Sequence, residues 1–441
     1  MKVNFFRLSE MSSSQRRDLC RRGGVDLGQL IPVVMPILEA VRSNGDEAVR
    51  AFTKRFDGAD MTPVSFRVTT SEMERAVAGL APELREAMEV SIRNIRAFHE
   101  RQAELSHWEM NISPGIVAGE KVVPIASVGL YVPRGKGSFP SMMMMSGVPA
   151  MVAGVERVVV VSPPDSHGKA DPATIAAARM IGIEEMYQVG GVQAVAALAF
   201  GTESIPRVDK IVGPGSGYVL AAKQLLASEI DTGLPAGPSE AVVLTDDSVE
   251  PALAVTDLLI EAEHGPDSAA YLVTADEHFA AKALELIPLF VAELPLERRS
   301  FCESVFGSTG GVVVARDMSD ALEFVNEFAP EHLQLLTRNP RDILEQVRYA
   351  GEVLLGPFTP GTLANYSIGP NAILPTSGFA RTASALSVRD FTRRMSYSVV
   401  NESGFASLAP KTLVLAEYEG FAAHARALNY RRGGKTNPQK S

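Results

Sequence analysis

The stretch that decides the fold begins with SVGLYV (Ser127–Val132), continues through a methionine-rich segment around Met142–Met145 and reaches VVVV (Val158–Val161). Short runs of β-branched and apolar residues predict strands, and the alanine- or methionine-rich segments between them predict helices. The same alternation continues to a short strand at Lys210–Val212. Strands that alternate with helices in this way predict a parallel sheet with helices on both faces.

The alternation extends in both directions along the chain. Further strands are expected at Met61–Thr69, Met186–Val189, Ala241–Leu244, Tyr271–Thr274, Gly311–Val314, Leu333–Thr337 and Val353–Leu355. Helices are expected at Leu30–Phe56, Ser71–Leu105, Ala173–Met180, Val192–Phe200, Tyr218–Leu226 and Phe421–Tyr430, with others starting at Pro251 and after His278. The pattern repeats after the Gly/Pro/Ser-rich connection Thr232–Ser239, which predicts two α/β units rather than one barrel.

Composition bounds the class of protein. The 441 residues exceed one minimal domain, and with 46% hydrophobic residues the chain can build sizeable cores. The net charge of −10 argues against a nucleic-acid binder. Cys20 and Cys302 cannot form a disulfide framework, and the N-terminus shows no signal peptide, so a cytoplasmic protein is expected. The uncharged segment Gly137–Val155 is interrupted by Ser, Pro and Gly and predicts a buried helix rather than a membrane span.

Four sequence features carry candidate chemistry. Gly213–Gly217 lies between a strand and a helix, which suits either an anion-binding loop or a tight glycine turn. Glu261 and His264 are expected on one face of a helix's last turn, as half a metal site or as a solvated pair. Glu331-His332 would serve as an acid/base pair if both converged from a loop, and is otherwise a surface dipeptide. His424 lies beside the apolar stripe of the last helix, where a packed or solvated histidine is the ordinary interpretation.

Ordered motifs along nearly the whole chain resemble those of histidinol dehydrogenases. The first group is Gly129–Pro133, Val189–Ala194, Lys210–Gly215, Ala236–Glu240, Ala262–His264 and Ala329–Leu333. The second is Gly369–Asn371, Leu374–Thr376, Leu386–Val388, Glu419-Gly420 and Ala423–Ala425. The resemblance implies an enzyme dependent on NAD and on one zinc ion per subunit, which oxidises L-histidinol through the aldehyde to L-histidine in two hydride transfers.

The resemblance also implies roles for individual residues. His332 would take the hydroxyl proton and Glu331 would activate the water that hydrates the aldehyde. Positions that contact NAD in the family correspond to Tyr131, Gln193 and Ser216. The implied metal ligands are Glu261, His264, Asn365 and His424. The implied substrate-binding residues are Ser239, Glu261, His264, His332, Asn365, Glu419 and His424.

The implied fold is α/β, with two similar incomplete Rossmann-like domains, parallel sheets and small N- and C-terminal helical segments. The expected domains are an N-terminal segment 1–25, a first domain 26–120 with 240–387 that holds the metal and acid/base residues, and a second domain 121–239 on the NAD side. Residues 388–441 would be exchanged in a homodimer, so that Glu419 and His424 reach the partner's active site.

Four residues depart from the family pattern. The family has glutamine at the position of Glu261 and aspartate at that of Asn365, so the two changes exchange an amide and a carboxylate and keep one of each. This exchange favours a retained but rearranged metal site. Ala372 replaces a histidine beside the substrate, and Ser216 replaces an asparagine near NAD.

These departures leave the substrate open between L-histidinol and another polar primary alcohol, such as a different amino alcohol or a sulfonated diol, because one polar contact can change substrate discrimination by orders of magnitude. A non-catalytic NAD- or metal-binding regulator is the third interpretation. Retention of Glu331, His332, His264 and His424 argues against it.

Overall fold

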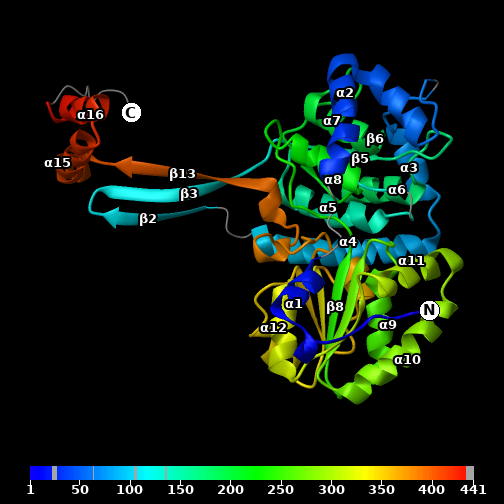
Figure 1. Ribbon diagram of the computed structural model, residues 1–441. Helices are drawn as coiled ribbons and strands as arrows, with labels where there is room; N and C mark the ends of the chain where they lie inside the picture. The colour runs from blue at the N-terminus through cyan, green and yellow to red at the C-terminus, as the bar shows by residue number, and fades with distance from the viewer. Residues whose placement is uncertain (22–26, 63, 104–106, 135–136, 434–441) are drawn as a thin grey trace. The chain divides into compact units, whose positions relative to one another are not determined.

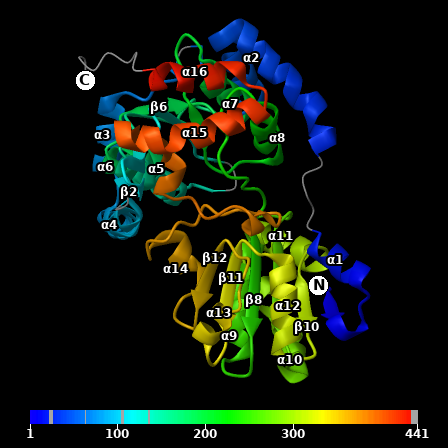
Figure 2. The same cartoon turned by 90° about the vertical axis from the view of Figure 1, so that its left-hand side faces the viewer.

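In the computed structural model, a six-stranded parallel sheet carries the motif Ala329–Leu333. The structure describes residues 1–21, 27–62, 64–103, 107–134 and 137–433. The strand order is β1–β10–β9–β8–β11–β12, and every neighbouring pair is parallel. The strands are β1 (Phe5–Arg7), β8 (Glu240–Thr245), β9 (Ala269–Thr274), β10 (Gly311–Val314), β11 (His332–Leu336) and β12 (Glu352–Leu355). Figure 2 shows β12, β11 and β8 side by side.

Helices cover both faces of this sheet (Figure 1). α9 (Pro251–Ala262), α10 (Glu277–Glu293) and α11 (Leu296–Gly307) pack on one face, where Val243, Leu272 and Val312 are buried. α12 (Met318–Phe328) and α1 (Ser13–Cys20) pack on the other, over Val242 and Leu244. Because both faces are covered, all six residues of β8 are buried, which explains its unbroken apolar run.

A second parallel sheet has the order β6–β5–β4–β7. Its strands are β4 (Ser127–Tyr131), β5 (Arg157–Ser162), β6 (Glu185–Gln188) and β7 (Lys210–Val212). Alternate residues of β5 serve the two faces: Val159 and Val161 join one core, and Val158 and Val160 join the other. The helices around this sheet are α2 (Leu27–Phe56), α3 (Thr70–Ala78), α4 (Pro82–Ala103), α5 (Pro140–Ala153), α6 (Pro172–Ile181), α7 (Gly191–Phe200) and α8 (Gly217–Leu225).

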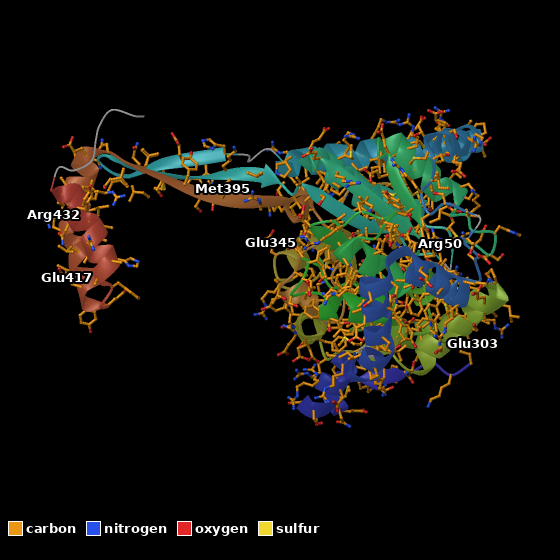
Figure 3. The ribbon with its side chains drawn as sticks, turned by 90° about the horizontal axis from the view of Figure 1, so that it is seen from above. Arg50, Glu303, Glu345, Met395, Glu417 and Arg432 are labelled. Atoms are coloured by element: carbon orange, nitrogen blue, oxygen red, sulfur yellow. The ribbon has the colours of Figure 1, made fainter. Side chains whose placement is uncertain are left out.

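A separate unit comprises residues 104–123 and 392–441. Within its described part, β2 (His107–Ser113), β3 (Ile116–Pro124) and β13 (Thr392–Val400) form a ribbon in the order β13–β3–β2, followed by α15 (Glu402–Tyr418) and α16 (Ala422–Arg432). Figure 3 shows Met395 on the ribbon and Glu417 and Arg432 on the two helices. Large apolar side chains of this unit are exposed, among them Trp108, Met110, Val399, Val414 and Tyr418.

Two parallel α/β units are therefore confirmed, while some local predictions are wrong. The helix expected over Ser71–Leu105 is divided into α3 and α4, because Pro82 starts a new helix after the Gly79 cap. The strand expected at Met61–Thr69 is, within the described residues, a single bridge from Arg67 to Tyr187. No helix in the described ranges is long and apolar enough to cross a bilayer, and Gly137–Val155 contains the buried helix α5.

The expected grouping of residues 26–120 with 240–387 also differs from the observed packing. α2 packs on α7 and α8, α3 packs on α6, and α4 packs on α5, so these helices cover the β4–β7 sheet. The amphipathic pattern of a helix records that one face is buried without recording which sheet buries it. The N-terminal segment also joins a core, since β1 extends the larger sheet.

Candidate active site

Two predicted glutamate–histidine pairs, Glu261 with His264 and Glu331 with His332, lie at the amino-terminal edge of the six-stranded sheet. Glu240, His332 and Glu352 are the first residues of β8, β11 and β12, and the register pairs His332 with both Ala241 and Glu352. α9 connects the parallel strands β8 and β9, so it runs back toward this edge and brings Glu261 there in its last turn. The site is thus assembled from strand starts and one helix end.

Three of the four predicted metal ligands lie together, because His264 and Asn365 both contact the carboxylate of Glu261. Glu261 is 3% exposed, its Oε2 lies 2.6 Å from His264 Nδ1, and its Oε1 accepts a 3.0 Å hydrogen bond from Asn365 Nδ2. Asn365 comes from α14 (Gly361–Tyr366), which packs against α9. His264 follows the Glu263 cap rather than lying within the helix as expected, yet it still turns toward Glu261.

The described residues hold no group of three His, Cys, Asp or Glu side chains placed to bind a metal. The predicted set is not such a group, because one of its ligands is the amide of Asn365 and another, His424, belongs to the ribbon unit. His424 lies on α16 and Glu419 caps α15; both are exposed and both belong to the ribbon unit. Carboxylate, imidazole and amide oxygen are all acceptable zinc donors, so the chemistry of the converging residues fits that metal.

Glu331 and His332 converge, as the acid/base interpretation requires. Both are buried, and His332 Nε2 lies 3.8 Å from Glu331 Oε1 and 3.8 Å from Glu261 Oε2. The other oxygen of Glu331 accepts a 2.8 Å hydrogen bond from the backbone N–H of Glu240. The turn into this pair is tight, because Ala329 adopts a left-handed conformation with φ 50°.

Burial and charge give these groups distinct protonation preferences. Burial raises the pKa of Glu331 well above its usual value. Burial opposes the charge on His332, but attraction to Glu261 and Glu331 and the bond to Glu352 outweigh it and raise the pKa of that imidazole to about 10. Burial also opposes the charge on Glu261, and attraction to His332 and His264 outweighs it and lowers the pKa to about 2. Glu261 is therefore the permanent anion of the cluster.

Glu352 is a site residue that sequence reasoning missed. Its Oε1 lies 2.6 Å from His332 Nδ1, and its side chain is 9% exposed. The two residues are separated by 20 positions and become neighbours through the β11–β12 register. A glutamate at the start of a short strand gave no signal of this contact.

The residues predicted to contact NAD lie at the carboxyl ends of the smaller sheet's strands. Tyr131 ends β4, and its hydroxyl accepts a 3.0 Å hydrogen bond from the backbone N–H of Gly191. Gln193 is buried on α7, where its Nε2 donates to Asp57 Oδ2 at 3.4 Å and its Oε1 has no partner. Ser216 is exposed at the start of α8 and makes no cap hydrogen bond.

The sheet order changes direction between β4 and β7, because β5 and β6 lie on one side of β4 and β7 on the other. Nucleotides bind at the carboxyl ends of parallel strands beside such a switch point. Gly213, which follows β7, has φ +121°, and a Cβ there would lie 2.1 Å from the carbonyl oxygen of Tyr131. Only glycine allows this close approach of the two strand ends.

Ser239 and Ala372 have different surroundings. Ser239 is half-buried directly before Glu240, at the same sheet edge as the acid/base pair. Ala372 is half-buried and packs on the apolar cluster around α5. Its neighbour Asn371 holds that segment by donating a 2.6 Å hydrogen bond to the carbonyl of Met145. Ala372 therefore supplies no polar group at the position where the family resemblance implies a histidine.

Asp257, one helical turn before Glu261, is a second missed carboxyl group. It lines a small cavity with Glu261, His332 and Gln334, and its Oδ2 has no hydrogen-bond partner. Burial raises its pKa to about 6. A carboxyl whose pKa is higher in the folded state than in the unfolded state destabilises the fold increasingly as the pH rises from about 4 to above 6.

Asp257→Asn should therefore raise the free energy of unfolding by ~1–3 kcal/mol at pH 8 and change it little at pH 4. Thermal unfolding at the two pH values measures this difference. Asp267→Asn, an exposed position beyond the same helix, is the matched control. An equal shift at both pH values would show that the effect comes from packing rather than from ionisation.

Two Rossmann-like parallel sheets and a buried glutamate–histidine pair define an α/β enzyme of the dehydrogenase class. The profile of the family described as histidinol dehydrogenase matches residues 20–432, and the chain belongs to that family. It is accordingly an oxidoreductase that acts on a CH–OH group.

Relatives agree with this assignment over almost the full length. The chain is 46% identical over 429 residues to the histidinol dehydrogenase of Synechocystis sp., covering 97% of this chain and 99% of that protein. It is 48% identical over 430 residues to a histidinol dehydrogenase homolog of Cereibacter sphaeroides, covering 97% of this chain and 98% of that protein. The crystal structure of histidinol dehydrogenase from Elizabethkingia anophelis matches with a TM-score of 0.91 at 32% identity, covering 98% of both chains.

Proposed function

We propose that this enzyme oxidises L-histidinol, through the aldehyde, to L-histidine in two steps that use NAD. The observation that carries the proposal is the convergence of Glu261, His264 and Asn365 beside the buried Glu331–His332 pair. A substrate held by the first three residues would present its hydroxyl to the pair. Membership of the histidinol dehydrogenase family supports the choice of substrate.

The proposed metal is zinc, one ion per subunit, held by Glu261, His264, Asn365 and His424. Bound zinc would hold and orient the substrate through its nitrogen atoms. Glu261 supplies the anionic oxygen of the set, because its buried carboxylate remains charged. Asn365 already lies against Glu261, so its amide needs only to present its carbonyl oxygen.

Proton transfer is assigned to the buried pair. His332 would accept the hydroxyl proton at Nε2, which faces the cluster of carboxylates. Zinc bound at Glu261 would offset the negative charge that raises the pKa of His332 in the metal-free protein, and would so favour the neutral imidazole. Glu331 would then take a proton from the water that adds to the aldehyde, and its pKa, raised by burial, suits it to hold that proton. The Glu240 N–H fixes one oxygen of Glu331 and leaves Oε1 on the side of His332.

NAD supplies the hydride acceptor in both steps. Tyr131, Gln193 and Ser216 are proposed to bind it, since all three lie at the carboxyl ends of β4, β6 and β7 or at the helix starts that follow. Gln193 Oε1 lacks a partner and is available as a buried acceptor. The N-terminus of α8, after the Gly213–Gly217 loop, favours a phosphate group.

We further propose a cytoplasmic homodimer in which residues 388–441 complete the partner's active site through Glu419 and His424. The ribbon unit supports this proposal because Trp108, Val414 and Tyr418 expose apolar surface that a second chain would bury. Ser239, at the sheet edge beside Glu240, is proposed to contact the substrate. The active-site domain would then comprise 240–387, and 121–239 would form the NAD side.

A paralogue that oxidises another polar primary alcohol is the second candidate. Ala372 favours it, because this side chain packs on an apolar cluster and offers no polar group to an imidazole-bearing substrate. Several of the similar proteins, including those of Rhizobium meliloti and Cereibacter sphaeroides, are named as histidinol dehydrogenase homologs.

The decisive experiment counts the NADH formed per molecule of limiting L-histidinol by the zinc-reconstituted enzyme at mildly alkaline pH. We expect two NADH per substrate, since both oxidations occur in one site. One NADH would show that oxidation stops at the aldehyde. No turnover by protein with stoichiometric zinc would contradict the histidinol assignment, and a panel of amino alcohols and sulfonated diols would then identify the substrate.

A further inference from the structure

Glu352 makes the shortest contact to the proposed proton acceptor, His332, yet neither the family motifs nor the sequence pattern gives it a role. Its carboxylate Oε1 lies 2.6 Å from His332 Nδ1, and both side chains are at most 9% exposed. The imidazole ring has two nitrogen atoms, and the bond made by one determines which form the other takes. A carboxylate at Nδ1 accepts a hydrogen bond, so the ring must carry its proton there.

We propose that Glu352 is a positioning residue that holds His332 in the orientation and tautomer in which Nε2 accepts the substrate's hydroxyl proton. The inference rests on the proposed function of His332. With Nδ1–H donated to Glu352, Nε2 is turned toward Glu261 Oε2 and Glu331 Oε1, each 3.8 Å away. A ring rotated by half a turn would place carbon atoms against the carboxylate and lose the contact.

The backbone makes this contact rigid. Glu352 and His332 are paired in the parallel register of β11 and β12. Two adjacent backbone hydrogen bonds, Gly351 N–H to Pro330 O and Glu352 N–H to Glu331 O, both 2.9 Å, fix the strand starts together. A Cβ at Gly351 would lie 2.6 Å from the carbonyl oxygen of Glu331, so glycine is needed for this approach. The side chain is therefore directed by the sheet rather than by a flexible loop.

A merely structural ion pair would stabilise the fold without controlling the ring. The two roles differ in what a small change at Glu352 does. Glu352→Gln keeps the size but can donate to Nδ1, which would favour the tautomer with the proton on Nε2, where it blocks proton acceptance. Glu352→Asp keeps the charge and the acceptor but shortens the side chain by one methylene. The aspartate variant should thus retain more activity than the glutamine variant.

The first test needs no substrate. Protein with ¹⁵N-labelled histidine and bound zinc should show a downfield Nδ1–H proton resonance that disappears in His332→Asn and is thereby assigned. We expect Glu352→Gln to move or abolish this resonance and Glu352→Asp to preserve it. Absence of the resonance in the parent protein, or an unchanged one in Glu352→Gln, would overturn the proposal whether or not L-histidinol is the substrate.

The second test uses whichever alcohol the parent enzyme oxidises. Glu352→Gln should lower kcat by about 10–100-fold with KM changed by less than about threefold, and Glu352→Asp should recover part of the loss. Glu345→Gln is the matched control, because it makes the same change at an exposed glutamate that lies seven positions before Glu352. Unchanged kcat in both Glu352 variants, or a change confined to KM, would contradict the positioning role.

Discussion

His332→Asn enzyme should retain stoichiometric zinc and lose about 10²–10⁴-fold in kcat, the range that positioned general bases contribute. Asparagine keeps a donor near the place of Nδ1 and can still bond to Glu352, while it removes Nε2, the atom that faces Glu261 and Glu331. The change therefore removes proton acceptance with little loss of packing. Steady-state kinetics and zinc analysis of the same preparation measure both effects.

A complementation control separates loss of chemistry from misfolding. In an equal mixture of His332→Asn and His424→Ala chains, half of the refolded dimers contain one chain of each kind. If active sites are shared between subunits, one site of each mixed dimer has both histidines intact, and the other site lacks both. The refolded mixture should then recover about a quarter of the parent activity although each variant alone is inactive. Full activity of His332→Asn alone would contradict its role as base, and absence of recovery in the mixture would contradict shared sites.

The sequence predicts those parts of the site that local spacing determines. Glu261 and His264 lie three positions apart at a helix end, and Glu331 and His332 are adjacent at the start of β11, so their proximity follows from local structure. Asn365 is separated from Glu261 by 104 positions, and only the family resemblance linked them. Glu352 could not be inferred, because its contact with His332 depends on strand register.

The fold shows the same division between local and long-range information. Unbroken apolar runs such as β8 predict buried parallel strands, and both α/β units were expected for that reason. The strand β2 was missed although Trp108, Met110 and Ile112 alternate in it with polar residues, the pattern of a strand with one apolar face. The grouping of α2 to α4 with the wrong sheet arose because amphipathic helices do not identify their partner.

Reversing the exchanged pair of metal ligands should distinguish a rearranged zinc site from an accidental pair of substitutions. Glu261→Gln removes the permanent anion of the cluster and should weaken zinc binding by at least about tenfold. Asn365→Asp alone places a second carboxylate beside Glu261 Oε1, where Asn365 now donates a 3.0 Å hydrogen bond. This variant loses that bond and gains repulsion between like charges in the metal-free protein.

The double variant Glu261→Gln/Asn365→Asp restores one carboxylate and one amide with the direction of the hydrogen bond reversed. We therefore expect the zinc affinity of the double variant to return to within about threefold of the parent's, above that of Glu261→Gln alone, because residues in contact couple strongly. Competition with a zinc-binding dye across the four proteins measures the coupling. Additive effects in this cycle would show that the two side chains do not share one ion. The double variant can also show coupled zinc affinity without any gain in L-histidinol turnover. In that case Glu261 and Asn365 control the metal site, and substrate choice is controlled elsewhere, at Ala372.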